Sequence, residues 1–183
     1  KIQMLNDERE TLGAALKYLG YSLNSTNEDE INEAAELVRA AKDRIATFDS
    51  DAYDDLLMSG ETVIAHGFNG NFFQSFDEAD AWETFGYAVP IEGGTVWVDN
   101  MAIPVTAQSV CTAHAFINFI MDAENGATLT NFNFYASPNA AAREFILPEI
   151  LEDPAIFPPE EVMANMEVIS GVGEASTLFA FGH

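Results

Sequence analysis

The spacing of apolar residues along the chain predicts a series of amphipathic helices. In the first of them Leu12, Leu16 and Leu19 fall on one face, and Gly20 is a typical residue at which a helix ends. A second and longer helix is preceded by Asn27, a residue type that favours the position before the first helical turn. The predicted helices cover residues 7–19, 28–45, 71–76, 109–122, 123–130, 138–145 and 173–181.

Short apolar runs between these helices predict strands, because Gly, Pro and acidic turns bound them. The runs cover residues 62–66, 85–89 and 96–103. Trp97 and Asp99 alternate within the third run, so their side chains would point to the same side of that strand. Helices that interleave with short strands indicate an α/β fold.

Composition and charge narrow the classes of function. Hydrophobic residues make up 48% of the chain, which is typical of a packed globular protein. The formal net charge of -23, from 7 Lys plus Arg against 30 Asp plus Glu, argues against a nucleic-acid partner. It is compatible with a cationic ligand, although an acidic surface also serves solubility. No apolar run reaches about 18 residues, so we expect no membrane-spanning segment.

The residues that could carry catalysis or hold a metal are scattered. Cys111 and His114 share a helical face but lack a third group that would orient them, so we expect Cys111 to be a buried structural thiol. His66 stands alone and is interpreted as a structural hydrogen-bonding residue. The acidic run 49–55 lacks the glycine of a calcium loop, and the glycine pair 93–94 lacks the rest of a phosphate loop. We therefore predict no enzyme, no cofactor and no metal site.

A different set of residues has the chemistry of a site for a cation. Carboxylates pair with ammonium groups, while aromatic faces hold cations and the methylene chain between them. Strand ends and helix starts are also the places where α/β folds bind ligands. The set consists of Asp7, Glu10, Phe68, Trp97, Asp99 and Tyr135.

Each member of this set has a simpler interpretation as well. Asp7 and Glu10 lie three residues apart at a helix start, which is the spacing of a capping box. The three aromatic side chains could belong to the core, and Asp99 could simply end a strand. Composition and spacing alone therefore support no more than an acidic α/β domain.

The order of several short motifs is similar to that of bacterial spermidine/putrescine-binding proteins of ABC importers. The most distinctive are PIEGGTVWVD at residues 90–99 and YASPNAA at residues 135–141. The other matching segments are residues 4–10, 15–21, 67–70, 101–104, 115–120 and 173–176. Together they run in family order along essentially the whole chain.

This resemblance implies a fold, a ligand and a partner. The implied fold is an α/β, periplasmic-binding-protein-like (type II) lobe within an incomplete two-lobe architecture. The implied ligand is a polyamine, spermidine or putrescine, which is held between two lobes and delivered to an ABC permease. The implied location is periplasmic or extracellular, after export, with the signal segment not present in this chain. The alternatives are another small cationic amine as ligand, or a stand-alone interaction lobe.

The resemblance also implies roles for the six residues of the set. Asp7 and Glu10 would bind amine groups, Asp99 would anchor another, and the three aromatic rings would line the polyamine channel. Phe68 departs from the family, where a Trp is frequent, and its ring attracts a cation less strongly. Ile169 aligns where the family can offer a polar amide, which leaves the choice between spermidine and putrescine open.

The resemblance divides the chain into three segments. Residues 1–97 would form an α/β segment of the second lobe, and residues 98–143 would return to the first lobe. Residues 144–183 would pack back on the second lobe, and the main part of the first lobe would be absent. We therefore expect residues 1–183 alone to bind polyamines weakly or not at all.

Overall fold

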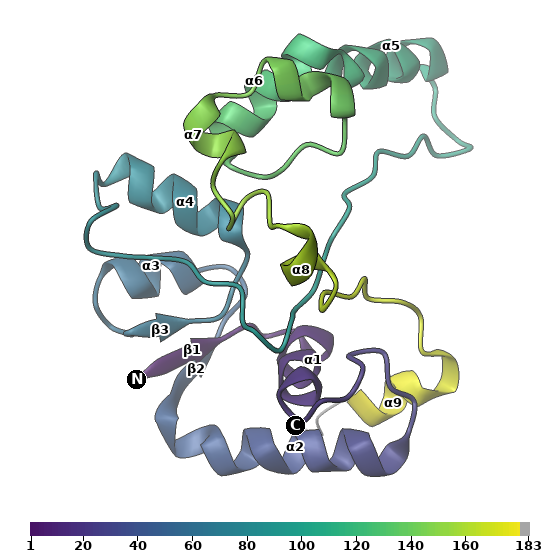
Figure 1. The fold of residues 1–183 in the computed structure, drawn as a ribbon. Helices are drawn as coiled ribbons and strands as arrows, with labels where there is room; N and C mark the ends of the chain where they lie inside the picture. Colours follow the sequence, from purple (N-terminus) through teal and green to yellow (C-terminus); the bar gives the residue numbers. More distant parts are fainter. Residues whose placement is uncertain (180–183) are drawn as a thin grey trace.

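The computed structural model of the protein describes residues 1–179, within which one parallel sheet of three strands forms the centre of the α/β unit. Strand β1 (Ile2–Met4) lies between β2 (Ile45–Phe48) and β3 (Ile64–Ala65), and Ile2 is paired with both Ile45 and Ile64. Because the three strands run in the same direction, their carboxyl ends meet at one edge of the sheet. The chain enters α1 from this edge after β1 and enters α4 from it after β3 (Figure 1).

The first two long helices follow the predicted periodicity and pack against each other. Helix α1 (Glu8–Tyr18) begins after Asp7, and α2 (Glu28–Ala41) begins after Asn27; both of these residues cap their helix through the side chain. Helix α2 ends earlier than predicted, because a 3-10 turn and then β2 take up the residues that follow. The core of this layer consists of Leu12, Ala15, Leu16, Ile31, Ala34, Ala35, Val172 and Phe179.

The C-terminal segment completes this layer. A 3-10 turn (Gly173–Ala175) leads into the short helix α9 (Ser176–Phe179), which contacts both α1 and α2. Residues 180–183, which belong to the predicted segment 144–183 and in part to the predicted helix 173–181, lie outside the described residues.

A second core lies on the other side of the sheet and is rich in aromatic rings. Helices α3 (Tyr53–Met58) and α4 (Asn69–Glu78) contribute Tyr53, Phe72, Phe73 and Phe76. The remaining elements around this core are α6 (Ala123–Asn133), a 3-10 turn (Ala140–Glu144) and α7 (Pro148–Leu151). Edge-to-face packing such as that of Tyr53 on Phe72, with centroids 5.1 Å apart, fixes the rings relative to one another.

Two of the three predicted strands are wrong. Residues 85–89 and 96–103 are irregular, apart from a bridge between Thr95 and Glu167 next to the second range. In the first range Phe85 and Tyr87 pack on the rings of α4, so their apolar character serves the aromatic core rather than a sheet. The second range crosses as an extended chain to α5, with no neighbouring strand along it in the described part of the molecule (Figure 1). The alternation argument for Trp97 and Asp99 therefore fails.

Helix α5 (Val110–Met121) corrects a further expectation. The sequence predicted an amphipathic helix with Cys111 as a buried structural thiol, yet none of the residues in this described helix is buried and Cys111 is exposed. The helix packs on α6 and lies with α6 and α7 at the top of Figure 1, away from the sheet. Phe116 and Phe119 are each 58% exposed, so this helix presents a broad apolar face.

Helix α8 (Glu160–Met163) lies on the returning chain, between the upper group of helices and the sheet layer (Figure 1). None of the helices within residues 1–179 combines the length and the apolar character that a bilayer crossing needs.

Candidate functional site

A cavity of about 220 Å³ lies beside the carboxyl ends of β1 and β3. Four of the six predicted site residues line it, and they come from four separate segments of the chain: Glu10, Phe68, Trp97 and Tyr135. Parallel sheets in α/β proteins bind ligands at this edge, where loops and helix starts converge. The structure thus brings together residues as far apart in the sequence as Glu10 and Tyr135, which are 125 positions apart.

Glu10 is the one acidic side chain that is buried among residues 1–179. Its carboxylate accepts hydrogen bonds from Thr95 Oγ1 at 2.9 Å and from Trp97 Nε1 at 2.6 Å. The capping-box prediction for Glu10 is therefore wrong, because its side chain turns into the cavity instead of back to the start of α1. Burial raises the pKa of Glu10, although the two hydrogen bonds oppose that effect.

Among the described residues, the buried carboxylate of Glu10 forms no ion pair. Within the described part of the chain, the ion pairs are Lys17 with Glu167 and Arg39 with Glu36. Two neutral donors satisfy part of the hydrogen-bonding capacity of Glu10, and the charge of Arg9 acts on the carboxylate more weakly than either hydrogen bond. A buried charge without a counterion is costly, and an ammonium group in the cavity would remove that cost.

Three aromatic side chains form much of the remaining wall. Phe68 precedes α4 and packs edge-to-face on Tyr53, with the ring centroids 6.2 Å apart. Trp97 is 50% exposed, so that one part of its ring faces outward while its N–H binds Glu10. Tyr135 donates its hydroxyl to Asn71 Oδ1 at 2.5 Å and lies close over Gly70. These contacts fix the rings around the cavity without filling it.

Asp7 and Asp99 do not line the cavity. Asp7 is exposed and accepts a hydrogen bond from the Glu10 backbone N–H at 2.9 Å, so it caps α1 as its position predicted. Asp99 is also exposed, yet its charge contributes, after burial, to the raised pKa of Tyr135. Both carboxylates therefore lie near the cavity rather than in it, and their role in ligand binding stays a prediction.

The sequence did not identify His66, Asn69 and Tyr87 as site residues, but all three line the cavity. The Nδ1 atom of His66 is buried and finds no hydrogen-bond partner in the described structure, so the interpretation of His66 as a hydrogen-bonding residue is not supported. Burial raises the pKa of Tyr87 to about 12. The position of His66 directly after a strand was the one available signal.

We expect His66 to make the stability of the fold depend on pH. Burial lowers its pKa from 6.5 to about 4, while the charge of Asp7 opposes the shift. The unfolded chain therefore binds a proton that the folded chain excludes. The resulting stabilisation is complete above pH 6.5 and is lost as the pH falls towards 4, by on the order of 3 kcal/mol.

Urea unfolding between pH 7 and pH 4 measures this effect. The His66→Asn variant should lose less stability than the wild type over this range. A matched His114→Asn variant should behave like the wild type, because His114 is exposed on α5. Equal pH slopes for all three proteins would refute the assignment.

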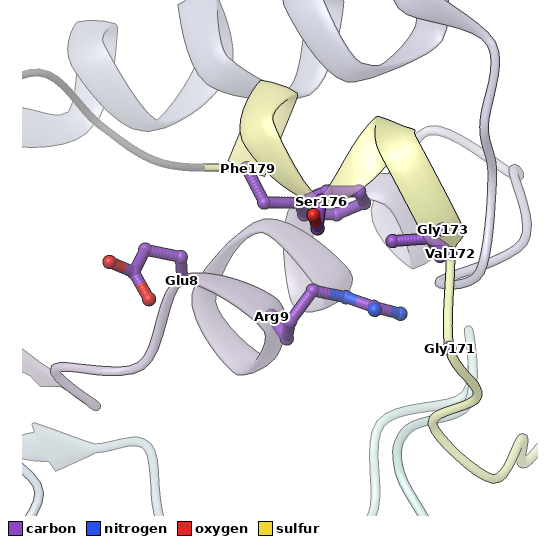
Figure 2. A pocket seen from close by; sticks show the side chains of 7 residues that line it. All are labelled: Glu8, Arg9, Gly171, Val172, Gly173, Ser176 and Phe179. Carbon is purple, nitrogen blue, oxygen red and sulfur yellow. The ribbon is translucent and has the colours of Figure 1, made fainter.

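A larger hollow of about 420 Å³ lies between α1 and the C-terminal segment (Figure 2). The Arg9 guanidinium stacks over the Phe179 ring, 4.5 Å from its centroid, and donates hydrogen bonds to oxygens of Ser170, Leu23 and Asn24. No residue of the predicted set lines this hollow as the structure describes it. We therefore place the site at the smaller cavity.

The chain is similar in sequence to known solute-binding proteins. Residues 1–158 match the bacterial extracellular solute-binding protein family. A putrescine/cadaverine-binding protein of Pseudomonas aeruginosa is 37% identical over 170 residues, which cover 91% of this chain and 48% of that protein. A spermidine/putrescine-binding periplasmic protein of Escherichia coli is 32% identical over 176 residues, which cover 96% of this chain and 50% of that protein.

Solved structures give the same result for the fold. A putative spermidine/putrescine ABC transporter protein from Listeria monocytogenes superposes with a TM-score of 0.85 at 32% identity, over 97% of this chain and 56% of that one. A lipoprotein of Treponema pallidum superposes with a TM-score of 0.82 at 33% identity, over 97% and 55%. The expected type II periplasmic-binding-protein-like fold is confirmed. The chain spans about half the length of the curated relatives that it matches.

Proposed function

The chain belongs to the bacterial extracellular solute-binding protein family, and on this basis we propose that it binds a polyamine of the putrescine–spermidine class for delivery to an ABC permease. One observation carries the choice of ligand: Glu10 is a buried carboxylate without a cationic partner among residues 1–179, in a cavity walled by aromatic rings. We place the protein outside the cytoplasm, because the relatives from Salmonella typhimurium and Escherichia coli are periplasmic proteins.

The two kinds of side chain serve different parts of such a ligand. An ammonium group beside Glu10 would supply the missing countercharge, worth roughly 4 kcal/mol at 4 Å and an effective dielectric near 20 before desolvation. The rings of Phe68, Trp97 and Tyr135 would cover the methylene chain and attract the cation by about 0.5–2 kcal/mol each. Asp99, beside Tyr135, would hold a second ammonium, and Asp7 would add to the negative field.

We further propose that the three segments of the chain divide between two lobes, with residues 1–97 and 144–183 in the second lobe and residues 98–143 in the first. The exposed apolar face of α5 supports this division, because a face with Phe116 and Phe119 requires a covering layer. The half-exposed ring of Trp97 supports it as well. A cleft between lobes would close over this ring when the ligand binds.

Calorimetric titration of the protein, as its gene encodes it, tests the proposed ligand. We expect putrescine and spermidine to bind, and 1-butylamine, which has one ammonium group, to bind at least about tenfold more weakly because it makes one charge pair fewer. Neutral 1-butanol is the matched blank. No heat of binding with any polyamine would refute the proposed function.

The alternatives predict other results in the same experiment. A site for another small cationic amine would bind choline or lysine more tightly than putrescine. A stand-alone interaction lobe would bind none of these compounds. We propose that the protein is not an enzyme, because the cavity joins an acidic group to aromatic walls without a nucleophile and base in contact at its described wall.

A further inference from the structure

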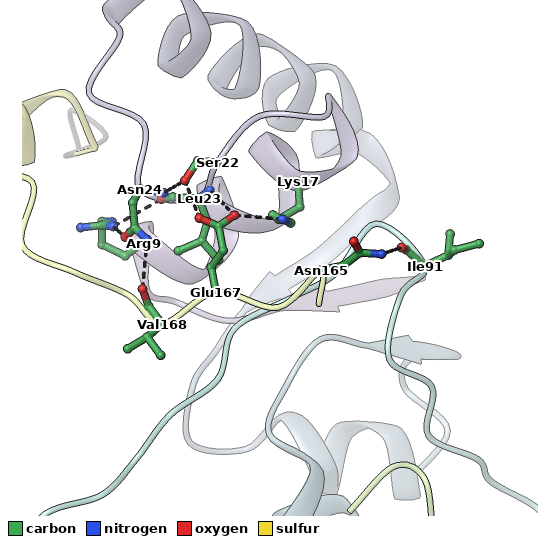
Figure 3. Close-up of polar contacts among 9 residues, drawn as sticks. All are labelled: Arg9, Lys17, Ser22, Leu23, Asn24, Ile91, Asn165, Glu167 and Val168. Carbon is green, nitrogen blue, oxygen red and sulfur yellow. Dashed lines mark hydrogen bonds and ion pairs between the residues drawn. The ribbon is translucent and has the colours of Figure 1, made fainter. Parts of the chain in front are cut away.

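Glu167 lies on the segment between α8 and the 3-10 turn at Gly173–Ala175. Its side chain contacts both α1 and the loop that follows α1. Its carboxylate accepts hydrogen bonds from Lys17 Nζ at 2.9 Å, from Ser22 Oγ at 2.5 Å and from the backbone N–H of Leu23 at 3.4 Å (Figure 3). Partial burial is the largest single influence and opposes ionisation, but the hydrogen bonds from Ser22, Lys17 and Leu23 and the charge of Lys17 together lower the pKa of Glu167. The Glu167 side chain is therefore ionised, and it holds its own segment of the chain against α1 and the loop after α1.

The backbone of the same residue holds the segment that reaches Glu10. The Glu167 N–H donates to the Gly94 carbonyl at 3.0 Å, and the Val96 N–H donates to the Glu167 carbonyl at 2.9 Å. Between and beyond these bonds lie Thr95 and Trp97, whose side chains are the two donors to the buried carboxylate. A displacement of Glu167 would therefore move both donors.

Further contacts hold the chain around Glu167 in place against the segment that contains Thr95 and against the loop after α1. Asn165 Nδ2 donates to the Ile91 carbonyl at 3.2 Å, and Asn24 Nδ2 donates to the Val168 carbonyl at 3.0 Å (Figure 3). Gly93 has a φ of +100°, and a side chain there would collide with the backbone carbonyl of Asn165. The chain around Glu167 is thus packed against the glycine turn on one side and tied to the loop after α1 on the other.

We propose that Glu167 is a positioning residue for the ligand site: it fixes Thr95 and Trp97 at hydrogen-bonding distance from Glu10 by tying their segment to Lys17 and Ser22. It touches no ligand itself and acts through the two donors. The effect on polyamine affinity rests on the proposed function, whereas the effect on the Trp97–Glu10 hydrogen bond does not.

The indole N–H of Trp97 reports this role directly in ¹⁵N-labelled protein. Trp97 is one of two tryptophans in residues 1–183, and its indole signal is assigned as the one that a Trp97→Phe variant lacks. In the Glu167→Ala variant we expect the indole signal to lose the downfield shift of a hydrogen bond to a carboxylate, and its exchange with solvent to accelerate by about tenfold. Putrescine affinity should fall by about tenfold in the same variant.

Two further variants separate positioning from a general effect on folding. Glu167→Gln keeps the side-chain volume and one acceptor, so its indole signal and affinity should lie between those of the wild type and Glu167→Ala. Glu36→Gln removes an exposed ion pair on α2 and should change neither readout. If Glu167→Ala does not fold, Glu167→Gln decides the question with the same two readouts.

The possible results are distinct. An indole signal with wild-type shift and exchange in a folded Glu167 variant would overturn the positioning role, whatever the affinity. Wild-type protein that ignores putrescine would refute the proposed function, while the indole signal would still test the role of Glu167. A lowered affinity with an unchanged indole signal would also overturn the proposal, because the effect would then not pass through Trp97.

Discussion

Replacing Glu10 by Gln is expected to weaken putrescine binding at least about a hundredfold. The substitution keeps the shape of the side chain but removes the charge that would pair with an ammonium group, and losing one partner of a buried charge pair costs about 3 kcal/mol or more. Calorimetric titration of the protein as its gene encodes it, at a single salt concentration, measures the change.

The same variant should behave in the opposite way without ligand. Since burial raises the pKa of Glu10, ionisation of this group opposes folding, and a neutral Gln should leave the free energy of unfolding unchanged or raise it. Glu8→Gln is the matched control, because Glu8 is an exposed residue on the same helix outside the smaller cavity. Putrescine affinity in Glu10→Gln within fivefold of the wild type would show that Glu10 is not the ammonium partner.

The pH dependence of binding follows from the same group. Putrescine needs the ionised carboxylate, so affinity should fall as the pH drops through the raised pKa of Glu10. In Glu10→Gln that fall should disappear, although the weaker contribution of other carboxylates remains. The wild-type curve and the variant curve together therefore assign the titrating group.

The elements that the sequence predicted well are those whose signal is local. Helices α1 and α2 have a capping residue, a regular apolar stripe and a clear end, and the structure follows all three within a few residues. The apolar run 62–66 was predicted as a strand because Gly and acidic turns bound it, and it contains β3 (Ile64–Ala65). Such features depend on neighbours in the sequence, so a single sequence contains them.

The elements that it predicted badly depend on distant partners. An apolar run such as 96–103 becomes a strand only if another strand lies beside it, and within the described residues none does along its length. The apolar stripe correctly predicted helix α5, but periodicity does not reveal which other segment covers that face, and the predicted burial of Cys111 was wrong. In both cases the apolar residues were identified correctly, but the sequence did not show which other segment of the protein would pack against them.

The candidate site divides in the same way. Motif order along the chain gave Glu10, Phe68, Trp97 and Tyr135, which the fold gathers around one cavity. It could not give His66, a lone side chain whose unpartnered Nδ1 is visible only in three dimensions. Nor could it give Glu167, whose side-chain partners lie 144 to 150 positions away. The sequence motifs identify side chains with the chemistry to bind a ligand, whereas the packed structure identifies the residues that hold those side chains in position.

One glycine next to the site is expected to have a large effect for a purely steric reason. Gly70 lies in the first turn of α4 and is buried, with the ring of Tyr135 lying over it. A Cβ atom at this position would come closer to three ring atoms than real Cβ atoms approach any neighbour. The backbone of Gly70 is helical, so a side chain there meets no conformational strain, and alanine would otherwise favour the helix by about 0.5–1 kcal/mol.

Gly70→Ala should therefore destabilise the fold by about 1–3 kcal/mol and weaken putrescine binding, because the ring of Tyr135 must move out of the cavity wall. Gly86→Ala is the matched control, since nothing lies within 4 Å of a Cβ at that position. In a Tyr135→Ala background the obstacle is gone, and Gly70→Ala should then be neutral or stabilising in urea unfolding. If Gly70→Ala lowers stability equally with and without Tyr135, the ring is not held over this glycine and its place in the site is wrong.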